Sequence, residues 1–159
     1  MLARGYTMLA DDLAAITLDG AGKPMVQPGF PQIKLWADAA QRLGRATDDL
    51  HRVRPQIDKF AVPTSSRFAA TPLPLSAIYM LYTHNESDIR LEVLADSDGF
   101  HAIRDHTFGW RYVAGLGTRL AHFRMAVAVA NTTPVVRVTR PRHPYLLDEL
   151  ADCIEEHLA

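Results

Sequence analysis

The chain has 159 residues, of which 48% are hydrophobic and 22% charged, with a net charge of −1 and one cysteine, Cys153. This composition predicts a soluble globular protein, long enough for one domain with its own core. The near-neutral charge gives no indication of a nucleic-acid or membrane surface. A single cysteine excludes an intrachain disulfide or a cysteine zinc site, and it fits a reducing cytoplasm, where we expect the protein to be located.

Strand-like and helix-like stretches alternate along the chain. Residues 1–4 are typical of the last turn of a helix that Gly5 ends. Strands are predicted, in chain order, over residues 6–9, 13–18, 23–27, 57–62, 75–82, 89–94 and 135–139. Helices are predicted over residues 33–43, 100–108, 115–130 and 145–158, with a further helical turn around 48–51.

Two features of this order indicate the fold class. The Asp19-Gly20 turn predicts that strands 13–18 and 23–27 form a hairpin. The continuous apolar run over residues 75–82 is the best candidate for a central strand. Alternating helices and strands, with hairpins mixed in, predict an α/β fold in which a mixed β-sheet is flanked by helices, as a single domain over residues 1–159.

The adjacent carboxylates of Asp11 and Asp12 stand between the first two predicted strands. Strand ends at one edge of a sheet are where α/β proteins bind ligands. Two neighbouring acids repel each other unless a cation or a proton offsets the charge. An exposed acidic turn explains the pair equally well, so both interpretations stay open at this point.

Other motifs for catalysis are missing from the sequence. It contains no Gly-x-Ser-x-Gly nucleophile elbow, no Gly-x-x-x-x-Gly-Lys-Ser/Thr phosphate loop, and no histidine pair with zinc-hydrolase spacing. A hard cation such as Mg²⁺ needs only one or two carboxylates together with substrate phosphates, which Asp11 and Asp12 can supply. Lys59 and Arg67 flank a proline-rich loop over residues 63–74, where they are candidates for phosphate contact.

The segment over residues 4–12, Arg-Gly-Tyr-Thr-Met-Leu-Ala-Asp-Asp, resembles the segment that follows the phosphate-loop helix in HPr kinase/phosphorylase. There a basic residue, a glycine, a short apolar strand and two aspartates occur in the same order. Further stretches resemble the HPr-kinase-related kinases, and they cover residues 28–31, 33–36, 59–63, 72–79 and 134–138.

The resemblance implies a phosphoenolpyruvate carboxykinase-like nucleotide-binding core and transfer of a phosphoryl group from ATP to a serine hydroxyl. It implies that Asp12 is the base for that hydroxyl and that Asp11 helps to hold Mg²⁺. By the same resemblance, Lys59 and Arg67 contact phosphate. The implied partner is a protein or peptide that carries the acceptor serine, with neither a nucleic acid nor a membrane involved.

Two parts of the family pattern are missing, namely the Glu-Val-Arg-Gly metal segment and the phosphate loop. We therefore expect the C-terminal portion of an HPr-kinase-like catalytic domain, a serine kinase that is incomplete as given. The alternatives are a non-catalytic binding domain that retains the kinase scaffold, and an unrelated metal-dependent phosphatase or hydrolase with further ligands near Asp11 and Asp12. An unpaired sheet edge and exposed apolar surface would favour a homo-oligomer.

Overall fold

The computed structural model describes residues 1–159, apart from the side chains of Asp96, Trp110 and Arg111. Within this described chain the fold is mixed α/β, with five α-helices and three three-stranded sheets. The α/β class is therefore confirmed, although three small sheets replace the one mixed sheet that was predicted. The chain divides into two compact units, Met1–Ile16 with Val26–Leu73, and Thr17–Met25 with Pro74–Ala159. None of the described helices has the length and apolar character needed to cross a membrane.

The first unit is built on an antiparallel sheet of order β3-β5-β4. Its strands are β3 (Gln32–Trp36), β5 (Ile57–Pro63) and β4 (His51–Arg54), and helix α1 (Ala37–Arg42) follows β3 directly. Phe60 and Val62 of β5 and Ala40 of α1 are buried. The predicted strand over residues 57–62 is confirmed.

Two predictions in this unit were wrong. Residues 33–36 form strand β3 and not the start of a helix, since they pair with β5 in the register Ile33↔Val62 to Trp36↔Lys59. The predicted helical turn around residues 48–51 is a turn that leads into β4. At β3 a backbone partner far away in the sequence replaces the local hydrogen bonds of a helix, whereas β4 pairs with the nearby β5, from His51↔Ala61 to Arg54↔Ile57.

The N-terminal segment belongs to the same unit. A 3₁₀ turn, η1 (Leu2–Arg4), ends at Gly5, whose φ of +100° is left-handed and whose N–H donates to the Leu2 carbonyl, as predicted. The predicted strand over residues 6–9 is reduced to a single parallel bridge between Met8 and Phe68. A second 3₁₀ turn, η2 (Ser65–Arg67), lies in the proline-rich loop.

A further sheet has the order β1-β2-β6, and its strands contain the points at which the chain passes between units. The strands are β1 (Ala15–Leu18), β2 (Pro24–Gln27) and β6 (Leu73–Pro74). The predicted hairpin is confirmed, because β1 and β2 are neighbours. Asp19 closes its turn by accepting the N–H groups of Ala21 and Lys23 at 2.9 and 2.8 Å.

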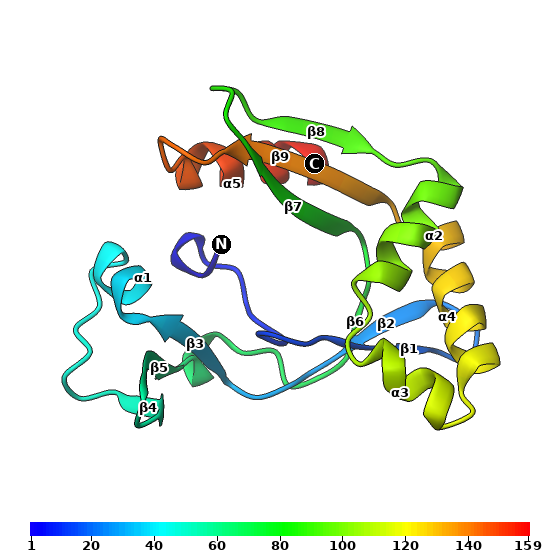
Figure 1. The fold of residues 1–159 in the computed structure, drawn as a ribbon, viewed down its shortest axis with the longest axis horizontal. Helices are drawn as coiled ribbons and strands as arrows, with labels where there is room; N and C mark the ends of the chain where they lie inside the picture. The colour runs from blue at the N-terminus through cyan, green and yellow to red at the C-terminus, as the bar shows by residue number, and fades with distance from the viewer. The chain divides into compact units, whose positions relative to one another are not determined.

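The second unit is built on a sheet of order β7-β9-β8, in which β7 runs parallel and β8 antiparallel to β9. The strands are β7 (Ile78–His84), β9 (Val135–Pro141) and β8 (Arg90–Val93), and helix α5 (Leu147–Leu158) lies against them (Figure 1). The core gathers Val136, Val138 and Leu150. The strand that was predicted to be central is β7, which lies at the edge of this sheet. The central strand is β9, whose valines are buried.

The remaining helices of this unit are α2 (Asp96–Asp105), α3 (Trp110–Gly115) and α4 (Arg119–Thr132). Helices α2 and α4 pack side by side (Figure 1). The rings of Phe100 and Phe123 meet edge to face between them, with their centres 5.6 Å apart. The helix predicted over residues 115–130 is confirmed as α4, which starts only at Arg119 because Gly117 takes a left-handed φ of +70° before it; α3 was not predicted. The predicted C-terminal helix is confirmed as α5.

Candidate functional site

The acidic pair lies in the irregular segment before β1, and strand β3 holds both of its carboxylates. The backbone N–H of Lys34 donates to Asp11 Oδ2 at 2.8 Å, and the Lys34 ammonium donates to Asp12 Oδ2 at 3.1 Å. Lys34 therefore holds Asp11 through its backbone N–H and Asp12 through its ammonium group.

A second lysine reaches the pair from strand β5. Lys59 Nζ lies 3.8 Å from Asp12 Oδ1 and 5.9 Å from the centre of the Trp36 ring. Trp36 and Lys59 face each other in the β3–β5 register, and Lys34 stands two residues before Trp36. Because side chains two residues apart project from the same face of a strand, the register brings both lysines to the face that carries Asp12.

The charges of this group shift the titration of Asp12. Its pKa lies below the usual value for an aspartate, mainly because of the hydrogen bond from Lys34 and further because of the charges of Lys59 and Lys34. The carboxylate is therefore ionised at neutral pH and is compensated by two ammonium groups. Each ammonium has three donors on a flexible stem, so it can exchange one anionic partner for another.

Arg67 is the predicted site residue that takes no part in this contact. Its Nη1 donates to the Leu2 carbonyl at 2.6 Å, which ties η2 to the N-terminal turn. It lines an open cavity of about 900 Å³ within the first unit, whose wall also includes Asp11 and apolar side chains such as Ile33 and Leu35. The structure thus brings Asp12 and Lys59 together, and places Arg67 and Asp11 on one cavity wall.

The resemblance implies Mg²⁺. Asp11 and Asp12 could supply only part of the ligands that this ion needs. Among the described side chains, no third histidine, cysteine, aspartate or glutamate joins the pair as a potential ligand. Mg²⁺ is commonly held by one or two carboxylates with phosphate oxygens and water. Lys34 and Lys59 engage the two oxygens of Asp12, so the pair would hold Mg²⁺ only together with nucleotide phosphates that draw these ammonium groups away. The phosphatase or hydrolase alternative lacks its further ligands within the described part of the chain.

Lys34 is the site residue that the sequence analysis missed. It falls within the stretch that we predicted as a helix, where it has no geometric relation to Asp12. The alternation of Ile33, Lys34 and Leu35 is the signal that would have placed it on a strand. The partner of that strand, and so the contact with Asp12, is not encoded locally.

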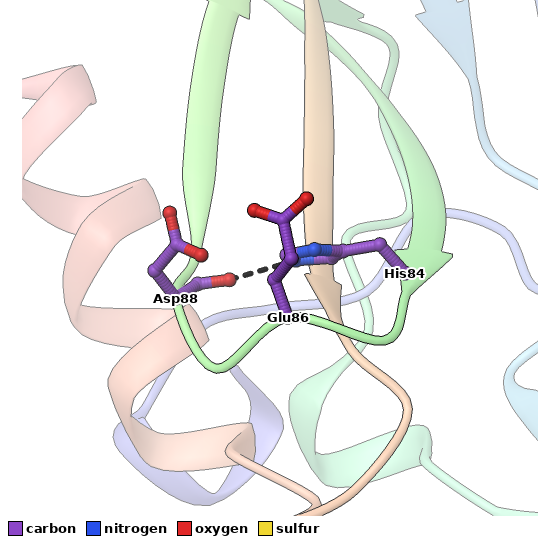
Figure 2. Close-up of side chains that lie close together, drawn as sticks. All are labelled: His84, Glu86 and Asp88. Atoms are coloured by element: carbon purple, nitrogen blue, oxygen red, sulfur yellow. Dashed lines mark hydrogen bonds between the residues drawn. The ribbon is translucent and has the colours of Figure 1, made fainter.

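The second unit contains a different cluster, in the loop that joins β7 to β8. His84, Glu86 and Asp88 each place a potential ligand atom within 4.8 Å of the others (Figure 2). His84 Nε2 lies 2.8 Å from the Asp88 carbonyl oxygen, which can only accept, so this nitrogen carries the proton. That hydrogen bond closes the loop and leaves Nε2 of the imidazole with a partner inside it.

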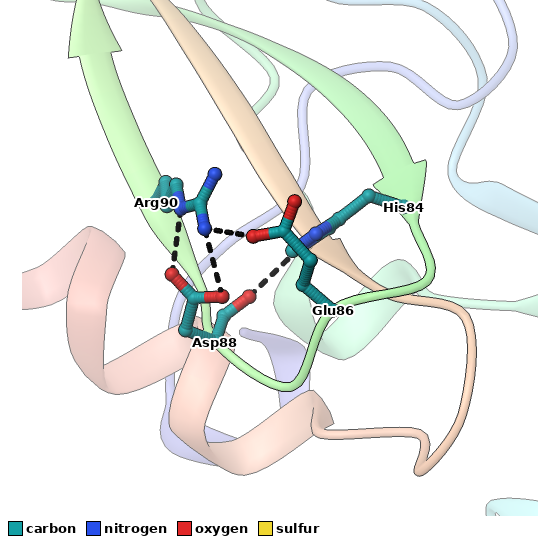
Figure 3. Close-up of polar contacts among 4 residues, drawn as sticks. All are labelled: His84, Glu86, Asp88 and Arg90. Atoms are coloured by element: carbon teal, nitrogen blue, oxygen red, sulfur yellow. Dashed lines mark hydrogen bonds and ion pairs between the residues drawn. The ribbon is translucent and has the colours of Figure 1, made fainter.

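The two carboxylates of this cluster are bound by an arginine from β8. Arg90 Nε donates to Asp88 Oδ2 at 2.6 Å, and Arg90 Nη2 pairs with Glu86 (Figure 3). The hydrogen bond from Arg90 is the largest cause that holds the pKa of Asp88 below its usual value. The geometry is that of a loop closed by an arginine fork, and it gives no support for a metal centre.

No protein-family model, curated protein or solved structure matches this chain. The likeness to HPr-kinase-related enzymes therefore stands on the residues quoted above alone. What that likeness implies for function is a proposal.

Proposed function

We propose that this chain carries part of an ATP-dependent serine kinase, on a partial phosphoenolpyruvate carboxykinase-like core over residues 1–159. The observation that carries the proposal is the convergence of Lys34 and Lys59 on the carboxylate of Asp12, at 3.1 and 3.8 Å. Phosphoryl transfer depends on cations around the phosphate and on a group that receives the hydroxyl proton, and this cluster offers both.

Each residue has a distinct role in this proposal. Asp12 accepts the proton of the acceptor serine at a carboxylate oxygen. Lys34 and Lys59 place positive charge beside that oxygen, and Asp11 adds a carboxylate that the Lys34 N–H orients. Bound ATP with Mg²⁺ supplies the phosphoryl group and the cation that neutralises its charge. The acceptor is a protein or peptide that presents a serine to Asp12.

The same contacts explain how the cluster would change when phosphate enters. In the structure the two ammonium groups are engaged with Asp12, which lowers its pKa and weakens it as a base. A phosphate group competes for the lysines, and as they turn to it the carboxylate loses compensating charge. The pKa of Asp12 then rises, which favours proton uptake from the serine.

The experiment is a titration of the protein with Mg·ATP, observed through the side-chain NMR signals of Lys34 and Lys59. We expect weak binding, since the sequence contains no Gly-x-x-x-x-Gly-Lys-Ser/Thr loop. Both lysine signals should shift, and the double variant Lys34→Ala, Lys59→Ala should lose the binding. Lys23→Ala, which removes the third lysine of the chain, is the matched control. Unmoved signals of Lys34 and Lys59 at saturating nucleotide would contradict the proposal.

Phosphoryl transfer itself is measured with radiolabelled ATP and a library of serine peptides, using the full-length gene product. Asp12→Asn should abolish transfer with little effect on the fold, because Asp12 lies at the surface. Transfer that persists in this variant would remove Asp12 from the role of base.

A non-catalytic binding domain is the second candidate, and the cavity of the first unit favours it. This cavity, of about 900 Å³, is open and lined mainly by apolar side chains, as is usual for sites that bind a small molecule. Under this alternative the contacts around Asp12 are structural. Calorimetry with Mg·ATP would then give no heat, and Asp12→Asn would change stability only.

A further inference from the structure

The second unit exposes large apolar side chains in α3, in the turns beside it and in the first half of α4. We call Phe108, Tyr112, Leu116, Leu120 and Phe123 the exposed stripe; their exposed fractions run from 53% to 75%. With about 200 Å² for each full side chain, the stripe exposes on the order of 600 Å². Monomeric proteins seldom leave a patch of this size uncovered unless something binds there.

The spacing and local contacts of the stripe give it a defined form. Its members are separated by four, four, four and three residues: Tyr112 lies in α3, Leu120 and Phe123 lie in α4, and Phe108 and Leu116 lie in the turns beside α3. The Phe123 ring is held edge to face by Phe100, and the Tyr112 ring lies over Gly109, where a Cβ would come within 2.9 Å of it. These aromatic rings are therefore positioned by packing, although they are open on the outside.

The charge around the stripe indicates the chemistry of the partner. From residue 99 to residue 147 the sequence contains seven arginines, no lysine and one acidic residue, Asp105. Asp105 is itself paired with Arg104, at 2.7 Å. Arg119 and Arg124 are exposed on the first turns of α4, beside Leu120 and Phe123. Arg119 and Arg124 thus place positive charge beside the part of the stripe that lies in α4.

We propose that the exposed stripe binds an acidic amphipathic segment of a partner protein. Apolar side chains at helical spacing on that segment would cover the stripe, and its carboxylates would pair with Arg119 and Arg124. Aromatic residues and arginine, without lysine, make up the composition that protein interfaces favour. A second copy that docked the same face would set these arginines against each other, so charge disfavours a symmetric dimer. The proposal does not depend on the kinase assignment.

The probe is a fluorescein-labelled helical peptide of about 20 residues, with leucines along one face and glutamates elsewhere. We expect binding in fluorescence anisotropy that weakens as salt is raised. A peptide of the same composition with scrambled leucines, and one with lysine in place of glutamate, should each bind at least tenfold more weakly. Failure of the acidic amphipathic peptide to bind, or equal binding of the scrambled peptide, overturns the proposal.

Substitutions assign the binding to the stripe. The double variant Leu116→Ser, Leu120→Ser should weaken binding of the acidic peptide at least tenfold. Leu158→Ser, at an exposed leucine of α5, is the matched control and should leave it unchanged. Because these leucines are exposed, we expect all the variants to keep the wild-type circular dichroism spectrum.

Charge reversals provide the second arm. Arg119→Glu with Arg124→Glu should reduce both the affinity for the acidic peptide and its salt dependence, whereas Arg142→Glu should have little effect. The same variants are tested against vesicles of phosphatidylcholine with phosphatidylglycerol, against oligo-dT, and by sedimentation of the protein alone. If the stripe substitutions abolish binding to vesicles or oligo-dT, or dissolve an oligomer, the partner class proposed here is wrong.

Discussion

Leu150 on α5 offers a quantitative test of how the second unit is held together. It is 7% exposed and packs in the core with Val136 and Val138 of β9. Leu150→Ala removes about three carbon atoms from this core, which corresponds to roughly 2 kcal/mol of lost apolar transfer. The cavity left behind raises the expected loss of stability to about 3 kcal/mol.

Leu158 on the same helix is the matched control. It is 49% exposed at the end of α5, so Leu158→Ala should cost below about 1 kcal/mol. Because the chain has two compact units, one unfolding midpoint does not describe both. Amide exchange of Val136 and Val138 reports on the second unit directly.

At fixed pH and temperature, the protection of these two amides should fall by about a hundredfold in Leu150→Ala, the change that about 3 kcal/mol corresponds to. Leu158→Ala should change the same protection less than about fivefold. Similar effects of the two substitutions, or an unchanged exchange rate in Leu150→Ala, would mean that α5 does not cover the core of β9 in the way described.

Two further predictions follow from single contacts. Lys34→Ala should raise the pKa of Asp12 towards its usual value, as followed by carboxyl NMR. In the wild type the lowered pKa means that the ion pair stabilises the fold at pH values above the pKa of Asp12 in the unfolded chain, and that this stabilisation is lost as the pH falls through the pKa of Asp12 in the folded chain. An unchanged pKa in the variant would refute the assignment. Gly109→Ala should lower the free energy of unfolding, measured by thermal unfolding, by about 1–2 kcal/mol, because Gly109 has a φ of +70° and an added Cβ would come within 2.9 Å of the Tyr112 ring. Gly115→Ala is the control and should cause no loss, because nothing lies within 4 Å of its Cβ. Equal losses for the two variants would count against the left-handed turn at Gly109.

The parts of the fold that could be predicted from the sequence are those that depend on local chemistry. The turn after β1 follows from Asp19, which accepts two backbone N–H groups within four residues of itself. Helix α5 follows from its amphipathic spacing, and β8 from its alternation. In each of these, the pattern and the hydrogen bonds that satisfy it lie in the same few residues.

The parts that were mispredicted depend on partners far away in the sequence. Ile33 and Leu35 fit the alternating pattern of a strand, whereas Leu35 and Trp36 fit the spacing of a helix, and pairing with β5 decides between the two. That error also hid Lys34, whose contact with Asp12 exists only if β3 is a strand. Asp12 and Lys59 were assigned to one site through the resemblance. They lie 3.8 Å apart in the structure, a contact that no periodicity could have shown.

The carboxylates of Glu86 and Asp88 are held by an arginine, whereas that of Asp12 is held by lysines, and this difference in the cation affects what each cluster can do. Arg90 binds Asp88 through Nε and reaches Glu86 through Nη2, so a planar fork with fixed geometry holds the loop. Breaking it would leave two acids uncompensated. At Asp12 the cations are two lysines from neighbouring strands, each a point charge that can turn to a phosphate without moving the backbone. At Asp12 an entering anion can take the place of the carboxylate through rotation of the lysine side chains alone, which is why the proposal places phosphate exchange there.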